Sequence, residues 1–213
     1  MHIPTMLGVL SHELRTPAAV AGGYLRLLRD GRIDAAGQAR VLDQLEAAVV
    51  RLGRIGEEAA SLRRWIDSPT DAPSSRVAAD LVDAALSIAP GDVVLASDHN
   101  RAAQIACIDA SACVTALASV AAAVRREIGG DALGVGVSSD ARAAVVTVAM
   151  YPAAAAPAAG APHTPLLLNR GGLGLSLMVA DAVVTAHGGH LWTIASSPAS
   201  IAVTFPFPIQ VAP

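Results

Sequence analysis

The sequence predicts an α+β protein in which a helical hairpin, paired into a dimeric four-helix bundle, precedes an α/β sandwich. Three observations predict this class. Apolar residues between positions 7 and 66 recur at alternating spacings of three and four, a polar run with two prolines follows, and the remainder alternates helical with valine-rich segments. The expected division is a hairpin domain at 1–67, a linker at 68–76 and a sandwich domain at 77–213.

The first helix presents a histidine to solvent. If Leu10 and Leu14 face inward, His12 lies on the opposite side of the helix, Glu13 flanks it, and Thr16 follows one turn later on nearly the same face. The apolar stripe comprises Leu7, Leu10, Leu14, Pro17, Ala21, Tyr24 and Leu28. An exposed imidazole can attack a phosphoryl group, although a solvated surface histidine is the plain alternative.

A second helix continues the pattern after a break at 30–32. Its stripe comprises Val41, Leu45, Ala48, Leu52, Ile55, Ala59, Leu62 and Ile66. A lone two-helix hairpin buries little apolar surface, so the simplest way to cover the seam is to pair with a second copy into a four-helix bundle. We therefore expect a homodimer. The alternative is a hairpin that packs on the rest of its own chain.

Composition limits the remaining classes. The chain has 213 residues, of which 53% are hydrophobic, and a net charge of −3 without a concentrated basic stripe, which argues against a nucleic-acid partner. No apolar run approaches the ~20 residues that span a bilayer, and no signal-like start is present. We expect a cytoplasmic protein with no membrane contact. Cys107 and Cys113 are too few and wrongly spaced for a zinc site, so buried thiols and no bound metal are expected.

The second domain is expected to place helices on one face of a mixed sheet. The segment 151–165, rich in alanine and proline, is expected to be a loop. Expected helices are 77–88, 110–128 and 173–186, and expected strands are 93–95, 133–138, 143–150, 191–195 and 201–205.

The heptapeptide Ser11-His12-Glu13-Leu14-Arg15-Thr16-Pro17 resembles the H-box of bacterial two-component sensor histidine kinases. The resemblance implies that His12 is the phosphoacceptor, that Glu13 is its acid/base partner, and that Thr16 helps to place water when phosphorylated partners are dephosphorylated. It also implies that Pro17 kinks the helix.

Two later segments resemble the GHKL-type ATP-binding domain of the same kinases. The run 171–177, Gly-Gly-Leu-Gly-Leu-Ser-Leu, matches the second glycine box, whose amides meet nucleotide phosphates at a helix N-terminus. This implies that Gly172 and Gly174 belong to a nucleotide site, with Arg126 as a phosphate contact. The run His187-Gly188-Gly189-His190 matches the turn that follows, and its two histidines indicate a turn rather than a metal pair.

The departures from that family suggest that this nucleotide site is vestigial. Ser119 and Ala123 stand where the family has asparagines, and alanine cannot ligate magnesium. Met150 replaces the aspartate that binds adenine, a loss of roughly ten- to a hundredfold in affinity. Arg170 replaces the first glycine of the second box, and the lid at 153–161 holds only alanine, proline and glycine. We therefore expect that ATP binding has been lost.

Three functions follow from these observations. The favoured one is a dimeric histidine phosphotransfer protein in which His12 exchanges a phosphoryl group with response-regulator receiver domains, whose own Mg²⁺ suffices for the chemistry. The degenerate second domain would then be a docking scaffold. The second is an active histidine kinase with an atypical nucleotide site. The third is a non-enzymatic pseudokinase regulator for which His12 is dispensable.

Overall fold

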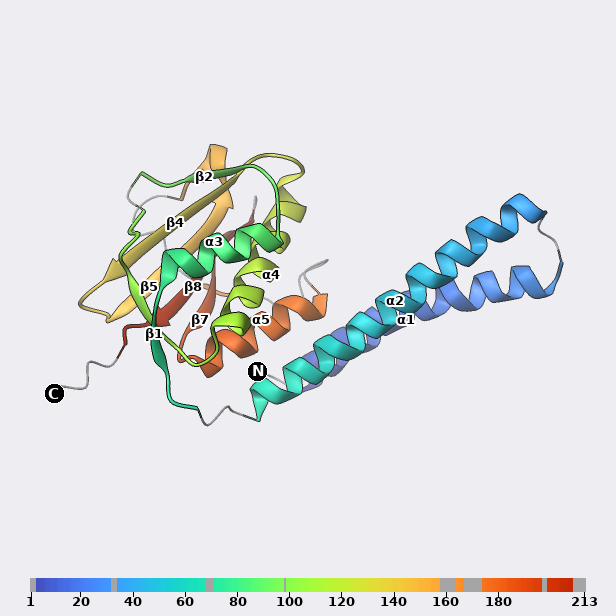
Figure 1. Cartoon of the computed structure of the whole chain (residues 1–213), viewed down its shortest axis with the longest axis horizontal. Coiled ribbons are helices and arrows are strands. Elements are labelled where there is room, and N and C mark those ends of the chain that lie inside the picture. Colours follow the sequence, from blue (N-terminus) through green and yellow to red (C-terminus); the bar gives the residue numbers. More distant parts are fainter. Residues whose placement is uncertain are drawn as a thin grey trace. The chain divides into compact units, whose positions relative to one another are not determined.

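The computed structural model divides the chain into two compact units, Met1–Arg63 and Arg64–Pro213 (Figure 1). It describes residues 3–31, 34–67, 71–97, 99–157, 164–166, 174–196 and 199–208.

The first unit is a hairpin of two long helices, α1 (Ile3–Arg29) and α2 (Ala35–Ile66). The turn is set by Gly31, whose φ of 64° suits glycine and whose N–H donates to the Leu28 carbonyl at 3.2 Å. Asp34 then caps α2 by accepting a hydrogen bond from the Gly37 N–H at 2.8 Å. In the described part of the chain, no helix is long and apolar enough to cross a membrane.

The seam of the hairpin follows the predicted stripes. Its buried members are Pro17, Val41, Ala48, Ile55 and Leu62. Pro17 lies inside α1, and the helix continues through it. Leu7 and Leu14, in contrast, remain 56% and 37% exposed, because two helices cannot cover stripes that are wider than one contact line.

The second unit is a six-stranded mixed sheet with a separate two-stranded sheet. The order in the large sheet is β2-β4-β5-β8-β7-β6, with β2 and β4 parallel and every other neighbouring pair antiparallel. Its strands are β2 (Val93–Leu95), β4 (Leu133–Asp140), β5 (Val145–Pro152), β6 (Thr164–Pro165), β7 (His190–Ser196) and β8 (Ala199–Pro206).

Three helices, α3 (Ala78–Ile88), α4 (Ala110–Ile128) and α5 (Gly174–Ala186), form a layer against this sheet (Figure 1). On β5, the alternating residues Val146, Val148 and Met150 are fully buried, as a strand with one covered face requires. The predicted α+β class is confirmed, and the predicted helices begin and end within one residue of those observed.

Four short elements were not predicted. Strand β1 (Ser74–Val77), which overlaps the end of the expected linker, pairs antiparallel with β3 (Gln104–Cys107). The expected loop 151–165 instead contains the end of β5, a 3₁₀ turn η1 (Ala153–Ala155) and β6. Strands this short carry too few residues for alternation to show, and tertiary pairing decides them. At the β1–β3 pair, for example, the Ser75 hydroxyl donates to the Gln104 side-chain oxygen at 2.6 Å.

The turn between α5 and β7 tolerates nothing larger than glycine at position 189. A Cβ built there would lie 2.0 Å from the Thr204 carbonyl oxygen on β8. We expect Gly189→Ala to lower the free energy of unfolding by about 3 kcal/mol, because rigid backbone must move. Chemical denaturation measures this. Gly53→Ala on α2, where nothing lies within 4 Å, is the control and should be neutral or slightly stabilising; equal losses in both variants would contradict the argument.

Candidate functional site

A groove of about 380 Å³ runs along the hairpin between α1 and α2. It is lined by His12, Glu13, Thr16, Pro17, Val20, Gln44, Ala47, Ala48 and Arg51. The structure therefore brings His12, Glu13 and Thr16 into one wall, and α2 supplies the facing wall. Gln44 and Arg51 in that facing wall were not singled out from the sequence.

The helix geometry explains why His12 is accessible. Each residue turns the helix by about 100°, so the step from half-buried Leu10 to His12 carries the side chain well away from the seam. His12 and Thr16 are both exposed, whereas Pro17, next along the chain, is buried in the seam. The imidazole can therefore be reached by another molecule while its helix stays packed.

Glu13 is held by an ion pair from the other helix. The Arg51 guanidinium bonds the Glu13 carboxylate, and the two side chains are 37% and 17% exposed. Partial burial limits the freedom of the carboxylate beside His12, and a charge-assisted hydrogen bond of this kind is stronger than a neutral one. The sequence could not indicate Arg51, because the residue that meets Glu13 depends on how the two helices align across the turn.

The side of the hairpin opposite the groove is apolar. Leu42 and Val49 each follow a buried seam residue of α2 by one position, and Leu7 and Leu14 each precede a seam residue of α1 by three. One residue forward turns the helix by about 100°, and three residues back is equivalent to about 60° in the same sense. Because the two helices are antiparallel, Leu42 and Val49 on α2 and Leu7 and Leu14 on α1 therefore lie on the same side of the hairpin. We call these four residues the apolar face. Leu42 and Val49 are 56% and 60% exposed.

Two of the three positions at which the resemblance expects nucleotide-binding side chains are buried. Ala123 on α4 is 2% exposed, and Met150 on β5 is fully buried. The Ser119 hydroxyl donates to the Thr115 carbonyl within its own helix at 2.9 Å. None of these three side chains offers a carboxylate or amide.

The other residues assigned to the nucleotide site are only partly described. Gly174 begins α5 with a φ of 61°, a left-handed conformation that favours glycine. Arg126 is exposed in the last turn of α4. Gly172, like the rest of 167–173, lies outside the described residues.

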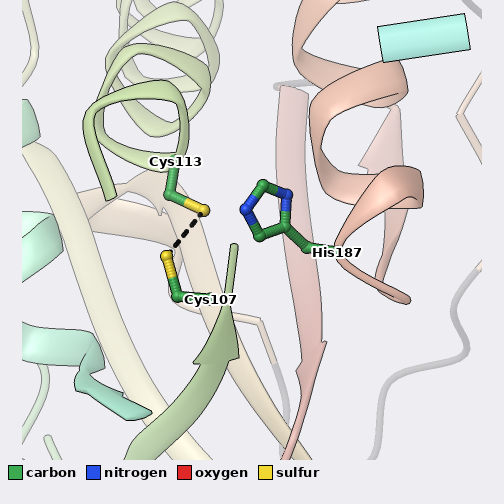
Figure 2. A group of neighbouring side chains, drawn as sticks. All are labelled: Cys107, Cys113 and His187. Carbon is green, nitrogen blue, oxygen red and sulfur yellow. Dashed lines mark hydrogen bonds between the residues drawn. The ribbon is translucent and has the colours of Figure 1, made fainter. Parts of the chain in front are cut away.

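A second cluster, Cys107, Cys113 and His187, gathers at one end of α4 (Figure 2). The Cys107 and Cys113 sulfurs are 3.6 Å apart, and both thiols are free and fully buried. The two cysteines are buried thiols, as predicted. Their approach to His187 was not predicted, because the histidine comes from far along the chain and only the tertiary fold brings it here.

The cluster shifts the ionisation of its members. The hydrogen bond from Cys113 lowers the pKa of Cys107 to about 5, against the opposing effect of burial. The same interaction raises the pKa of Cys113, since a second thiolate beside the first is unfavourable. Burial lowers the pKa of His187, but its contacts with Cys107 and the Val183 carbonyl outweigh burial and raise it overall.

Comparisons with known proteins agree with the hairpin and the fold. Residues 5–64 match the family model of the His Kinase A (phospho-acceptor) domain. The Acinetobacter baumannii histidine kinase AdeS superposes with a TM-score of 0.65 at 16% identity, covering 92% of this chain and 98% of that one. Full-length ShkA, solved in complex with AMPPNP, superposes with a TM-score of 0.57 at 18% identity, covering 97% of this chain and 46% of ShkA. Such identities establish the fold alone. No curated protein sequence matches significantly.

Proposed function

We propose that this chain, whose residues 5–64 match the family model of the His Kinase A (phospho-acceptor) domain, is a two-component signalling protein in which His12 exchanges a phosphoryl group with response-regulator receiver domains. The observation that carries the proposal is the exposed His12 in one groove with Glu13 and Thr16. A nucleophile on a packed helix, with an acid beside it, is the arrangement that phosphoryl transfer requires.

The transfer chemistry needs little beyond these residues. A ring nitrogen of neutral His12 attacks the phosphorus of an aspartyl phosphate, a P–N bond forms, the P–O bond to the aspartate breaks, and the carboxylate leaves. The receiver's Mg²⁺ offsets the charge on the phosphoryl oxygens. Glu13, held by Arg51, accepts the proton of the other ring nitrogen or balances its positive charge. In a separate reaction, Thr16 orients a water that attacks the phosphorus of the aspartyl phosphate, the P–O bond to the aspartate breaks, and inorganic phosphate is released.

We further propose that the linker at 68–76 leads into a second domain, residues 77–213, that has lost ATP binding. This domain would serve as a docking scaffold. Buried Ala123 and Met150 stand where the family resemblance calls for a magnesium ligand and an adenine-binding carboxylate. Gly172, Gly174 and Arg126 would be remnants of the phosphate site. Loss of the metal ligand removes the ion that bridges the nucleotide phosphates, so turnover of ATP should be lost first.

The hairpin domain, residues 1–67, is proposed to be a homodimer that pairs through the apolar face. A second copy would complete the four-helix bundle and remove exposed leucine and valine from water. Because the apolar face lies opposite the groove, His12 would stay open to a receiver. We place the protein in the cytoplasm, where receivers are found.

Offering two phosphoryl donors to the same preparation tests this function. Purified protein is incubated with radiolabelled ATP and Mg²⁺ in one arm, and with a panel of receivers labelled by acetyl phosphate in the other. Acid-labile label on this chain is then measured. We expect label from a receiver and none from ATP.

The other outcomes choose among the remaining functions. Label from ATP that His12→Gln removes would establish an active kinase and overturn the proposed loss of ATP binding. No label from either donor, together with stable binding to a receiver, would favour the non-enzymatic regulator and overturn phosphotransfer.

A further inference from the structure

The cluster of Cys107, Cys113 and His187 belongs to the second unit and has no part in the proposed phosphotransfer. We propose that these three side chains bind one thiophilic d¹⁰ metal ion, Cu⁺ or Zn²⁺. Their ligand atoms all lie within 4.8 Å of one another. Soft thiolates together with an imidazole are the donors that such ions select.

The sulfur separation fits two ligands of a single ion. Metal–sulfur bonds of about 2.3 Å place two sulfurs ~3.8 Å apart at a tetrahedral angle and ~4.0 Å apart at a trigonal one. The Cys107 and Cys113 sulfurs lie 3.6 Å apart, so an ion could join them with side-chain shifts of a few tenths of an ångström. Cys107 ends strand β3 and Cys113 lies in the first turn of α4, and both elements are packed into the domain, which fixes the spacing before any ion arrives.

His187 is oriented as a metal-binding histidine would be. Its Nδ1 lies 2.7 Å from the Val183 carbonyl, which selects the tautomer with a proton on Nδ1 and a lone pair on Nε2. Such an outer hydrogen bond to a carbonyl is typical of histidine ligands. The imidazole ring points toward the two sulfurs (Figure 2). Nε2 now accepts a hydrogen bond from the Asp109 N–H at 3.1 Å, and the ion would replace this contact.

Burial and the number of donors favour Cu⁺ over Zn²⁺. Among the described residues the cluster offers three ligand atoms, whereas Zn²⁺ almost always takes four. The exposed fractions are 0% for both cysteines and 4% for His187, so a solvent water is poorly placed to be the fourth. The Asp109 carboxylate is not part of the cluster, and its Oδ1 caps α4 by accepting from the Ala112 N–H at 3.0 Å.

Anaerobic metal titration of the full chain tests the site. Reduced protein is equilibrated with Cu⁺ or with Zn²⁺ against a competing chelator, desalted, and its metal content and near-ultraviolet thiolate absorption are measured. We expect one Cu⁺ per chain with a thiolate-to-metal absorption band, and weaker uptake of Zn²⁺. Cys113→Ser and His187→Asn should each lower the affinity for Cu⁺ by at least about tenfold.

The control is His190→Asn, which removes an exposed imidazole three positions from His187 and should leave metal uptake unchanged. Thermal unfolding of each metal-free variant shows whether it folds. If a variant does not fold, the readout is taken from the wild-type protein instead. Alkylation of Cys107 and Cys113 is then compared with and without metal, and bound metal should protect both thiols. Metal uptake that survives both ligand substitutions would overturn the proposal. So would a reduced wild-type protein that takes up no metal and whose two thiols form a disulfide on exposure to air.

Discussion

His12→Gln should lower phosphoryl acceptance from a labelled receiver by at least about a thousandfold. The amide has no nucleophilic nitrogen, so no P–N bond can form. The side chain is exposed, so the free energy of unfolding should change by less than about 0.5 kcal/mol. Acid-labile label on the chain measures the first effect, and chemical denaturation measures the second.

Two control variants make this result specific. His190→Gln removes another exposed imidazole and should accept label as the wild type does. Thr16→Ala should also be labelled, but it should dephosphorylate the receiver more slowly, because Thr16 is proposed to orient water and not to take the phosphoryl group. Retention of label by His12→Gln would mean that another residue is the acceptor.

Charged residues on the apolar face should separate the proposed homodimer into monomers. Leu42 and Val49 are more than half exposed in the single hairpin. Two-fold symmetry doubles each substitution, so Leu42→Glu with Val49→Glu places four carboxylates where a dimer would bury apolar side chains. At about 1.5 to 3 kcal/mol for each buried side chain, the dimer dissociation constant should rise at least about a thousandfold. Sedimentation equilibrium measures it.

The neighbouring Val50 provides a matched control. It is 65% exposed on the same helix, but it points about 180° away from seam residue Val41. Val50→Glu adds the same charge and should leave the dimer intact. A wild-type chain that stays monomeric at micromolar concentrations, or equal disruption by Val50→Glu, would contradict pairing through the apolar face and favour a hairpin that packs on its own chain.

Local patterns in the sequence determined the regular elements. The three-and-four spacing around Pro17 and Ile55 predicted two helices and the side that each one buries, because a helix repeats its faces every few residues. The same periodicity placed His12 on the exposed side. The sequence also marked the two glycines before β7 as a turn. The structure gives the reason for one of them, because the Thr204 carbonyl oxygen leaves no room for a side chain at position 189.

The tertiary structure decided the contacts between distant segments. The Glu13–Arg51 ion pair depends on how α1 and α2 align across their turn, and strands β1 and β3 are too short to reveal their pairing by alternation. Cys107 and Cys113 have an uninformative spacing until α5 brings His187 beside them. Sequence periodicity reports only on neighbours along the chain, whereas a side chain's chemistry depends on which distant groups folding places next to it.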